Sequence, residues 1–217
     1  MLPEPPNEKK VRGFVIILYI VGIAGTAIPF TRELFMILTP AVLLLSVAIL
    51  FWFHVPGFDN KTTIIFAIIF LSSYLVEVAG VKTGQIFGAY SYGKGLGPKL
   101  FDTPLMIGLN WVLLVYCTSA ILDKMPAGSI IKITGASLLM VLYDLVMEQV
   151  APEMDMWSFD GGTAPLRNYV SWFILALIFH SILRVAGIRF TNRFAPFIFF
   201  CQGIFFIILF IIFKITK

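Results

Sequence analysis

Three carboxyl groups lie inside or at the ends of strongly apolar stretches of this sequence, where an ionised side chain is costly. Glu77 lies in one apolar run, and Asp144 and Glu148 lie near the end of another. The last two are four residues apart, so they share one face of a helix. A carboxylic acid held in apolar surroundings keeps its proton more readily than one in water. Such an acid could donate a proton to an alkene, which makes these three residues the candidate catalytic groups.

Aromatic and amide side chains near the same stretch ends suit the remaining steps of such a reaction. Protonation of an alkene gives a tertiary carbocation, which aromatic faces stabilise by cation–π attraction, most strongly without water. A second carboxylate, ionised and nearer water, could orient a water molecule as general base. The same groups would serve cyclisation if water were excluded and a proton were lost instead. The candidate substrate-binding residues are Asn110, Trp111, Tyr143, Asn168, Trp172 and Tyr90.

Each of these residues also has an ordinary structural interpretation. The carboxyl groups could form structural hydrogen bonds or reach the membrane interface. The two asparagines could join helix to helix, and the tryptophans could belong to an interfacial aromatic belt. His180 lies in the middle of an apolar run with only Arg184 close in sequence. We interpret it as a satisfied core histidine and not as a catalytic one.

The composition places the chain in a membrane. Of its 217 residues, 59% are hydrophobic and 13% are charged, whereas soluble domains carry about 25% charged residues. Runs of ~17–25 apolar residues cross the hydrocarbon core, and the backbone there must be helical. We therefore predict an all-α, polytopic integral membrane protein, with a polar N-terminal tail at 1–13 and a single transmembrane domain at 14–217. The seven predicted spans are 14–30, 34–53, 62–81, 103–122, 127–147, 168–188 and 194–213.

The alternation of the spans brings the polar groups together. Consecutive spans run in opposite directions, so the end of the third, the start of the fourth, the end of the fifth and the start of the sixth share one membrane face. All the candidate site residues lie at those ends or in the 82–102 loop. This loop is rich in glycine and aromatic residues. We predict that it forms the lid and wall of a site for a large apolar ligand.

The basic residues give a preferred orientation. With the N-terminus inside, nine Lys or Arg lie on the cytoplasmic side and seven on the other. The positive-inside rule then favours a cytoplasmic N-terminus, and the expected location is the cell (inner) membrane. The net charge of +4 is spread over many loops, so it indicates topology and not nucleic-acid binding. Cys117 and Cys201 fall inside predicted spans, so no disulfide framework is expected.

Several other protein classes lack their signatures in this sequence. A retinal protein should carry a Schiff-base lysine in its last span, and 194–213 has none. There is no His/Cys cluster with zinc spacing, no glycine-rich phosphate loop and no G-x-S-x-G nucleophile elbow. We therefore expect no metal site.

Four strings of residues resemble a known membrane family. They are TGQIFGAYSYG, LGPKLFDTPLMIGLNW, DLVMEQVAPEMDMW and PLRNYVSWF, in this order within residues 70–190. These strings resemble the membrane-embedded carotenoid biosynthesis family that includes carotenoid 1,2-hydratases. The resemblance implies addition of water to the ψ end of an acyclic or monocyclic carotenoid, without a cofactor. The implied partners are the carotenoid substrate, membrane lipid and other carotenoid enzymes, and no nucleic acid.

Two other functions stay open at this point. A cyclase would use the same protonation chemistry to close a carotenoid end group, and a non-enzymatic isoprenoid- or pigment-binding protein would release its ligand unchanged. A proton-coupled transporter fits less well, because the carboxyl groups cluster at one face and form no path across the bilayer. The proton donor also stays open between Asp144 and Glu77, with Glu148 as the base that orients water and the tryptophans as cation stabilisers.

Overall fold

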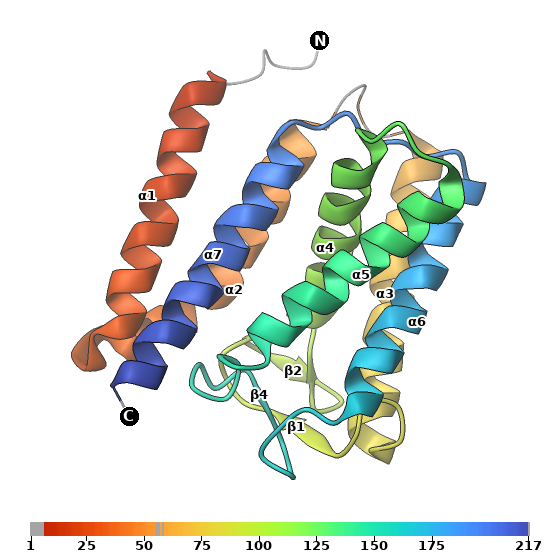
Figure 1. Cartoon of the computed structure of the whole chain (residues 1–217). Coiled ribbons are helices and arrows are strands. Elements are labelled where there is room, and N and C mark those ends of the chain that lie inside the picture. Colours follow the sequence, from red (N-terminus) through yellow and green to blue (C-terminus); the bar gives the residue numbers. More distant parts are fainter. Residues whose placement is uncertain (1–6, 55–56, 58, 217) are drawn as a thin grey trace.

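Seven α-helices long and apolar enough to cross a membrane make up most of the computed structural model (Figure 1). The structure describes residues 7–54, 57 and 59–216. Within these residues, the prediction of an all-α integral membrane protein with seven spans is confirmed. The helices are α1 (Glu8–Ala27), α2 (Pro29–Trp52), α3 (Asn60–Thr83), α4 (Met106–Asp123), α5 (Ser129–Met147), α6 (Leu166–Val185) and α7 (Phe194–Ile215).

The first helix begins earlier than its hydropathy indicates. It starts at Glu8, inside the segment predicted as a polar tail at 1–13, and residues 1–6 of that tail lie outside the described residues. The Asn7 side chain caps this helix by accepting hydrogen bonds from two backbone N–H groups of the first turn. Pro29 separates the first two helices, because it occupies the first position of α2 and disfavours a helical residue before it.

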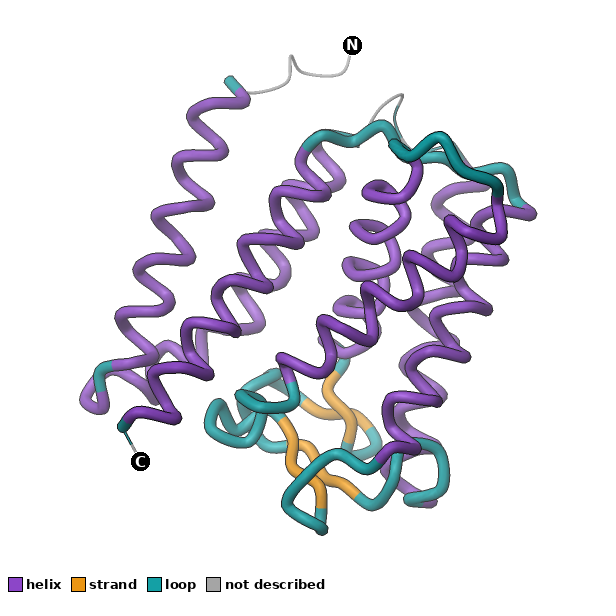
Figure 2. The backbone as a smooth tube through the Cα atoms, viewed as in Figure 1, coloured by secondary structure: helices purple, strands orange, loops and turns teal. Residues whose placement is uncertain are grey.

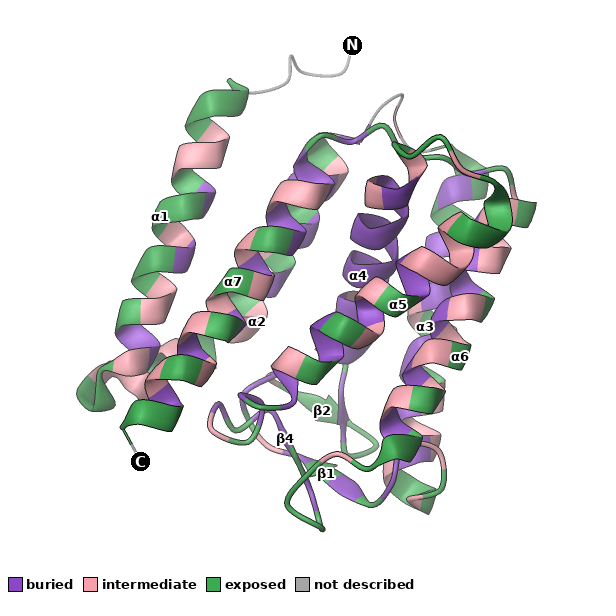
Figure 3. Ribbon diagram, viewed as in Figure 1, coloured by how far each residue is buried: buried purple, intermediate pink, exposed green. Residues whose placement is uncertain are grey.

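The fourth helix lies at the centre of the bundle. Of its apolar window, 78% is buried, against 22–39% for the other helices. It packs against α2, α3, α5, α6 and α7. Figure 3 shows that almost all of its own residues are buried. The other helices carry exposed Leu, Ile and Phe on their outer faces, as expected for helices surrounded by lipid. A span without charges from Met106 to Leu122 can occupy this central place.

Two small β-ladders close one end of the bundle, and the sequence does not predict either of them (Figure 2). β1 (Tyr90–Tyr92) pairs antiparallel with β4 (Trp157–Phe159), and β2 (Lys99–Leu100) pairs with β3 (Thr103–Pro104). Strands of two or three residues are too short to show an alternating pattern. The fourth span therefore starts at Met106 and not at 103 as predicted.

The β1–β4 ladder joins residues 84–105 and 148–165 into one cap over the helix ends. Gly93 of the first segment lies so close to Asp155 of the second that a Cβ atom would overlap the carboxylate. The backbone N–H of Lys94 donates to Asp155 Oδ2 at 2.9 Å, and that of Gly95 donates to the Asp155 carbonyl at 2.7 Å. The loop predicted as a lid is thus one of two loops that form the cap, and a glycine permits their closest contact.

Candidate active site

Glu77, near the end of α3, is buried beneath the cap and surrounded by hydrogen-bond donors. Tyr90 and Tyr92 of β1 donate their hydroxyl groups to Glu77 Oε2 at 2.6 and 2.8 Å. Trp111 of α4 donates its indole N–H to Glu77 Oε1 at 3.0 Å. Burial, reinforced by the Glu77 carboxyl group, raises the pKa of both tyrosines above the usual range, so both phenols are neutral donors. Glu77 therefore joins α3 to α4 and to the cap.

Asp144 and Glu148, at the end of α5, share one donor. Asn168 of α6 donates its amide N–H to Asp144 Oδ2 at 2.8 Å and to Glu148 Oε1 at 3.2 Å. Trp157 of β4 donates its indole N–H to Glu148 Oε2 at 3.0 Å. Asp144 is completely buried. In the part of the chain that the structure describes, its Oδ1 is the one fully enclosed side-chain nitrogen or oxygen without a hydrogen-bond partner.

Glu148 follows the last residue of α5 and is 8% exposed. Burial raises the pKa of this carboxyl group from 4.5 to about 7, while the hydrogen bonds from Trp157 and Asn168 lower it and the Glu77 carboxyl group raises it further. A carboxyl group with this pKa exchanges its proton readily near neutral pH. Because one amide bridges it to Asp144, the two carboxyl groups titrate as a pair.

Trp111 and Trp172 stack on each other in the interior and do not form an interfacial belt. Their ring centroids are 4.2 Å apart and their planes meet at 25°. Phe179 meets Trp111 edge to face, with a centroid distance of 5.7 Å. All three rings are buried, so a stack of aromatic rings stands next to Glu77 in the interior of the protein.

A small chamber lies between Glu77 and Glu148. Its volume is about 10 Å³, close to the ~10–15 Å³ that one water molecule needs. Two carboxyl groups and one amide face it, so it can hold a water molecule by hydrogen bonds. The residues that line it are Glu77, Phe87, Tyr90, Tyr92, Ile107, Glu148, Trp157, Phe159, Asn168 and Trp172.

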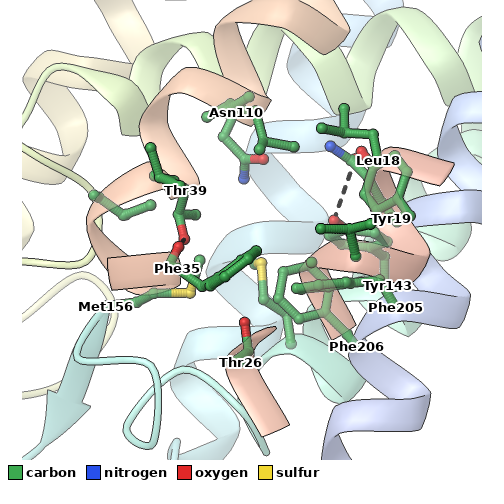
Figure 4. A pocket seen from close by; sticks show the side chains of 18 of the residues that line it. Leu18, Tyr19, Thr26, Phe35, Thr39, Asn110, Tyr143, Met156, Phe205 and Phe206 are labelled. Carbon is green, nitrogen blue, oxygen red and sulfur yellow. Dashed lines mark hydrogen bonds between the residues drawn. The ribbon is translucent and has the colours of Figure 1, made fainter. Parts of the chain in front are cut away.

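A larger and mainly apolar cavity borders the same region (Figure 4). Its volume is about 290 Å³, and α1, α2, α4, α5, α7 and the cap form its walls. Trp157 lines both the chamber and this cavity. Asn110 and Tyr143 also line the cavity, and the Tyr143 hydroxyl group donates to Gln202 Oε1 at 3.4 Å. These two residues therefore lie apart from the carboxyl groups with which the sequence analysis groups them.

The remaining predicted site residues come together as the alternation of spans indicates. Hydrogen bonds join the end of α3 to the start of α4, and the end of α5 to the start of α6, beneath one cap. The prediction that these four helix ends share one face is confirmed. The predicted residues found there are Glu77, Tyr90, Trp111, Asp144, Glu148, Asn168 and Trp172.

Comparison with known proteins shows where this chain belongs. Residues 38–214 match the model of a family described as carotenoid biosynthesis proteins. The chain belongs to this carotenoid biosynthesis family. The resemblance found in the four sequence strings is thereby confirmed.

A curated relative matches part of this carotenoid biosynthesis protein. A bisanhydrobacterioruberin hydratase from Haloarcula japonica is 28% identical over 157 residues, which cover 65% of this chain and 53% of the relative. The chain thus spans about half the length of that relative. No solved structure matches the chain.

The site of this carotenoid biosynthesis protein contains two residues that the sequence analysis does not select, Tyr92 and Trp157. They lie opposite each other in the β1–β4 ladder, so the donor to Glu148 lies beside a donor to Glu77. The strings YSY and WSF both alternate buried aromatic residues with an exposed serine. Three residues are too few for this shared alternation to predict the pairing from the sequence.

His180, on α6, has the structural role that the sequence analysis favours. It is buried, and its Nε2 lies 2.9 Å from the Thr118 hydroxyl group. Its Nδ1 lies 2.7 Å from the Ala176 carbonyl oxygen. The interpretation as a satisfied core histidine is confirmed.

Proposed function

We propose that this chain is a cofactor-free hydratase that adds water to the terminal C=C at the ψ end of an acyclic or monocyclic carotenoid, the carotenoid 1,2-hydratase reaction. Membership of the carotenoid biosynthesis family supports this proposal, as does the hydratase name of the relative from Haloarcula japonica. The observation that carries it is the buried pair of carboxyl groups, Asp144 and Glu148, bridged by the Asn168 amide.

Asp144 is the proton donor in this proposal. Its O–H bond breaks while the π electrons of the terminal double bond form a C–H bond at the less substituted carbon. A tertiary carbocation is left at the other carbon. Oδ1 is the atom suited to carry the proton, because no protein group competes for it in the described part of the chain. The Asn168 N–H on Oδ2 then stabilises the carboxylate that forms.

Glu148 is the general base. It accepts a proton from a water molecule while the water oxygen bonds to the tertiary carbon. The chamber beside it has room for that water, and a pKa of about 7 leaves a substantial ionised fraction near neutral pH. After the reaction Glu148 carries a proton and Asp144 lacks one. Transfer of one proton between these neighbours restores the starting state, and the net change is the consumption of one water molecule.

The aromatic rings around the chamber stabilise the carbocation. Trp157 and Trp172 both face the chamber, and their buried ring faces can stabilise a cation by cation–π attraction. Both oxygens of Glu77 are occupied by donors. We therefore assign Glu77 a positioning role and give the proton donation to Asp144.

The test is expression of the full chain in cells that accumulate lycopene or γ-carotene, followed by mass analysis of the extracted pigments. Cells with an empty vector are the control. Hydration gives a product heavier by one water. An isomer of unchanged mass with a shortened chromophore would establish cyclisation instead. An unaltered pigment that purifies with the protein would establish binding without reaction.

A further inference from the structure

The large cavity contains a polar group that the proposed reaction does not use. Asn110 of α4 is 7% exposed, and its amide points into the cavity (Figure 4). This amide has no hydrogen-bond partner among residues 7–54, 57 and 59–216. Two other polar side chains of the cavity are paired. The Tyr143 hydroxyl group donates to Gln202 at 3.4 Å, and the Thr39 hydroxyl group donates to the Phe35 carbonyl oxygen at 3.3 Å.

A buried amide without a partner is unfavourable in an apolar cavity, so its presence indicates a ligand atom that pairs with it. An amide offers a carbonyl acceptor and N–H donors, and a hydroxyl group both donates and accepts. The rest of the lining is dominated by side chains such as Leu18, Leu43 and Phe205, which match a hydrocarbon. The chemistry of the cavity therefore fits a hydrocarbon chain that carries a hydroxyl group.

Asn110 also lies close to the candidate active site. It belongs to the first turns of α4, directly beneath the cap, and the adjacent Trp111 donates to Glu77. Trp157 lines the same cavity and donates to Glu148. A hydroxyl group formed beside Glu148 would thus arise next to the cavity into which the Asn110 amide points.

We propose that this cavity binds the end of a hydroxylated isoprenoid chain and that Asn110 hydrogen-bonds its hydroxyl group. The inference rests on the proposed function, because the tertiary alcohol formed by hydration is such a ligand. Asn110 then makes the protein selective for the alcohol. The parent hydrocarbon leaves the amide unpaired and binds less tightly.

The test compares the binding of lycopene and of its 1-hydroxy derivative to the purified full chain in detergent, with the pigments recovered and weighed after titration. The wild-type chain should bind the alcohol about tenfold more tightly, as expected from one buried hydrogen bond. Asn110→Leu keeps the shape of the side chain but removes its polar atoms. It should abolish the preference and bind lycopene at least as tightly. A preference that survives in Asn110→Leu, or that is absent from the wild-type chain, overturns the assignment.

A second pair of variants tests the cavity itself. Val42→Phe fills the cavity from α2, and Val170→Phe adds the same bulk at an exposed position of α6. Val42→Phe should weaken the binding of both pigments by about tenfold, and Val170→Phe should leave it unchanged. Equal binding by the two variants would place the ligand elsewhere and overturn the inference.

The pigment masses keep this inference separate from the proposed reaction. A chain that hydrates lycopene but has no preference for the alcohol retains the proposed function and loses the role of Asn110. A chain that hydrates nothing but binds the alcohol through Asn110 retains the binding site and loses the hydratase. The two failures therefore give different results.

Discussion

Glu77 and Asp144 are both acids buried beneath the same cap, but the protein surrounds them differently. Glu77 accepts hydrogen bonds on both oxygens, from two tyrosines and a tryptophan. Asp144 accepts one from Asn168 and leaves Oδ1 unpaired. A buried carboxyl group with its hydrogen bonds made is suited to hold structure. A buried carboxyl group with an unpaired oxygen can still bind a ligand or a proton.

The two acids also differ in what they connect. Glu77 ties α3 to α4 and to β1, so it fixes the cap on the bundle. Among the described residues, the one donor to the Asp144 side chain is shared with Glu148, so a proton can move between these carboxyl groups without breaking contacts to other elements. The same change from acid to amide should therefore have opposite consequences at the two positions.

The largest effect is expected from Asp144→Asn on activity. Carotenoid hydration should fall by about a thousandfold, because the amide has no acidic proton to give to the alkene. The midpoint of thermal unfolding in detergent should change little, since the amide oxygen can still accept the Asn168 N–H. Both quantities are measurable on the same detergent-solubilised protein, as initial rate of water addition and as unfolding temperature.

The matched control is Asp160→Asn, the same substitution at an exposed position of the cap. It should leave rate and unfolding temperature unchanged. Full hydratase activity in a folded Asp144→Asn chain would show that Asp144 is not the proton donor. The proposed difference in role between Asp144 and Glu77 would then be wrong.

Glu77→Gln should act mainly on stability. A glutamine has one oxygen, so its NH₂ group must face either the Trp111 indole N–H or the hydroxyl groups of Tyr90 and Tyr92. At least one buried donor then loses its acceptor, at a cost of about 1–3 kcal/mol in the free energy of unfolding. Denaturant unfolding in detergent measures this cost. Glu77→Leu, which removes both acceptors, should cost more.

The residual activity of the Glu77→Gln chain must be measured as well, because stability alone does not separate a structural role of Glu77 from a catalytic one. The Glu77→Gln chain that remains folded should still hydrate the carotenoid at a measurable rate. A variant as stable as the wild type but inactive would instead make Glu77 a proton-transfer residue, as the sequence alone allows.

The bilayer explains why much of this fold can be predicted from the sequence. Each span needs a long apolar run, so the number of helices follows from hydropathy, and the largest shift is the start of α1 at Glu8 instead of 14. The order of the spans then places Glu77 and Asp144 at one membrane face before any contact is known. The short strands of the cap have no such constraint, because loops outside the hydrocarbon can pair their backbone with water.

Position in the sequence alone does not show in which direction each side chain points, and the predicted site is wrong on this point. Successive residues on a helix point about 100° apart, so Asn110 and Trp111 cannot face the same space, and neither can Tyr143 and Asp144. In the structure one member of each pair joins the carboxyl groups and the other faces the apolar cavity. Trp157 enters the site through strand pairing between two loops, a long-range contact that its local sequence does not specify.

A further effect is expected in the pH dependence of stability, through Glu148. Its pKa is raised by burial from 4.5 to about 7 in the folded chain. Between these values the folded chain binds more protons than the unfolded chain. The free energy of unfolding should therefore fall as pH rises from about 4.5 to 7 and level off above, the reverse of a salt-bridged carboxylate. Unfolding in detergent at a series of pH values measures this slope.

Glu148→Gln should flatten the slope, because the amide does not titrate, and Asp160→Asn should leave the slope intact. The slope measured for Glu148→Gln also shows whether Glu148 or Asp144 is the group that titrates. They share the Asn168 amide, so the proton held near neutral pH belongs to both. A slope that persists in Glu148→Gln would locate the titration in Asp144. It would then exchange the proposed roles, with Glu148 as the proton donor and Asp144 as the base.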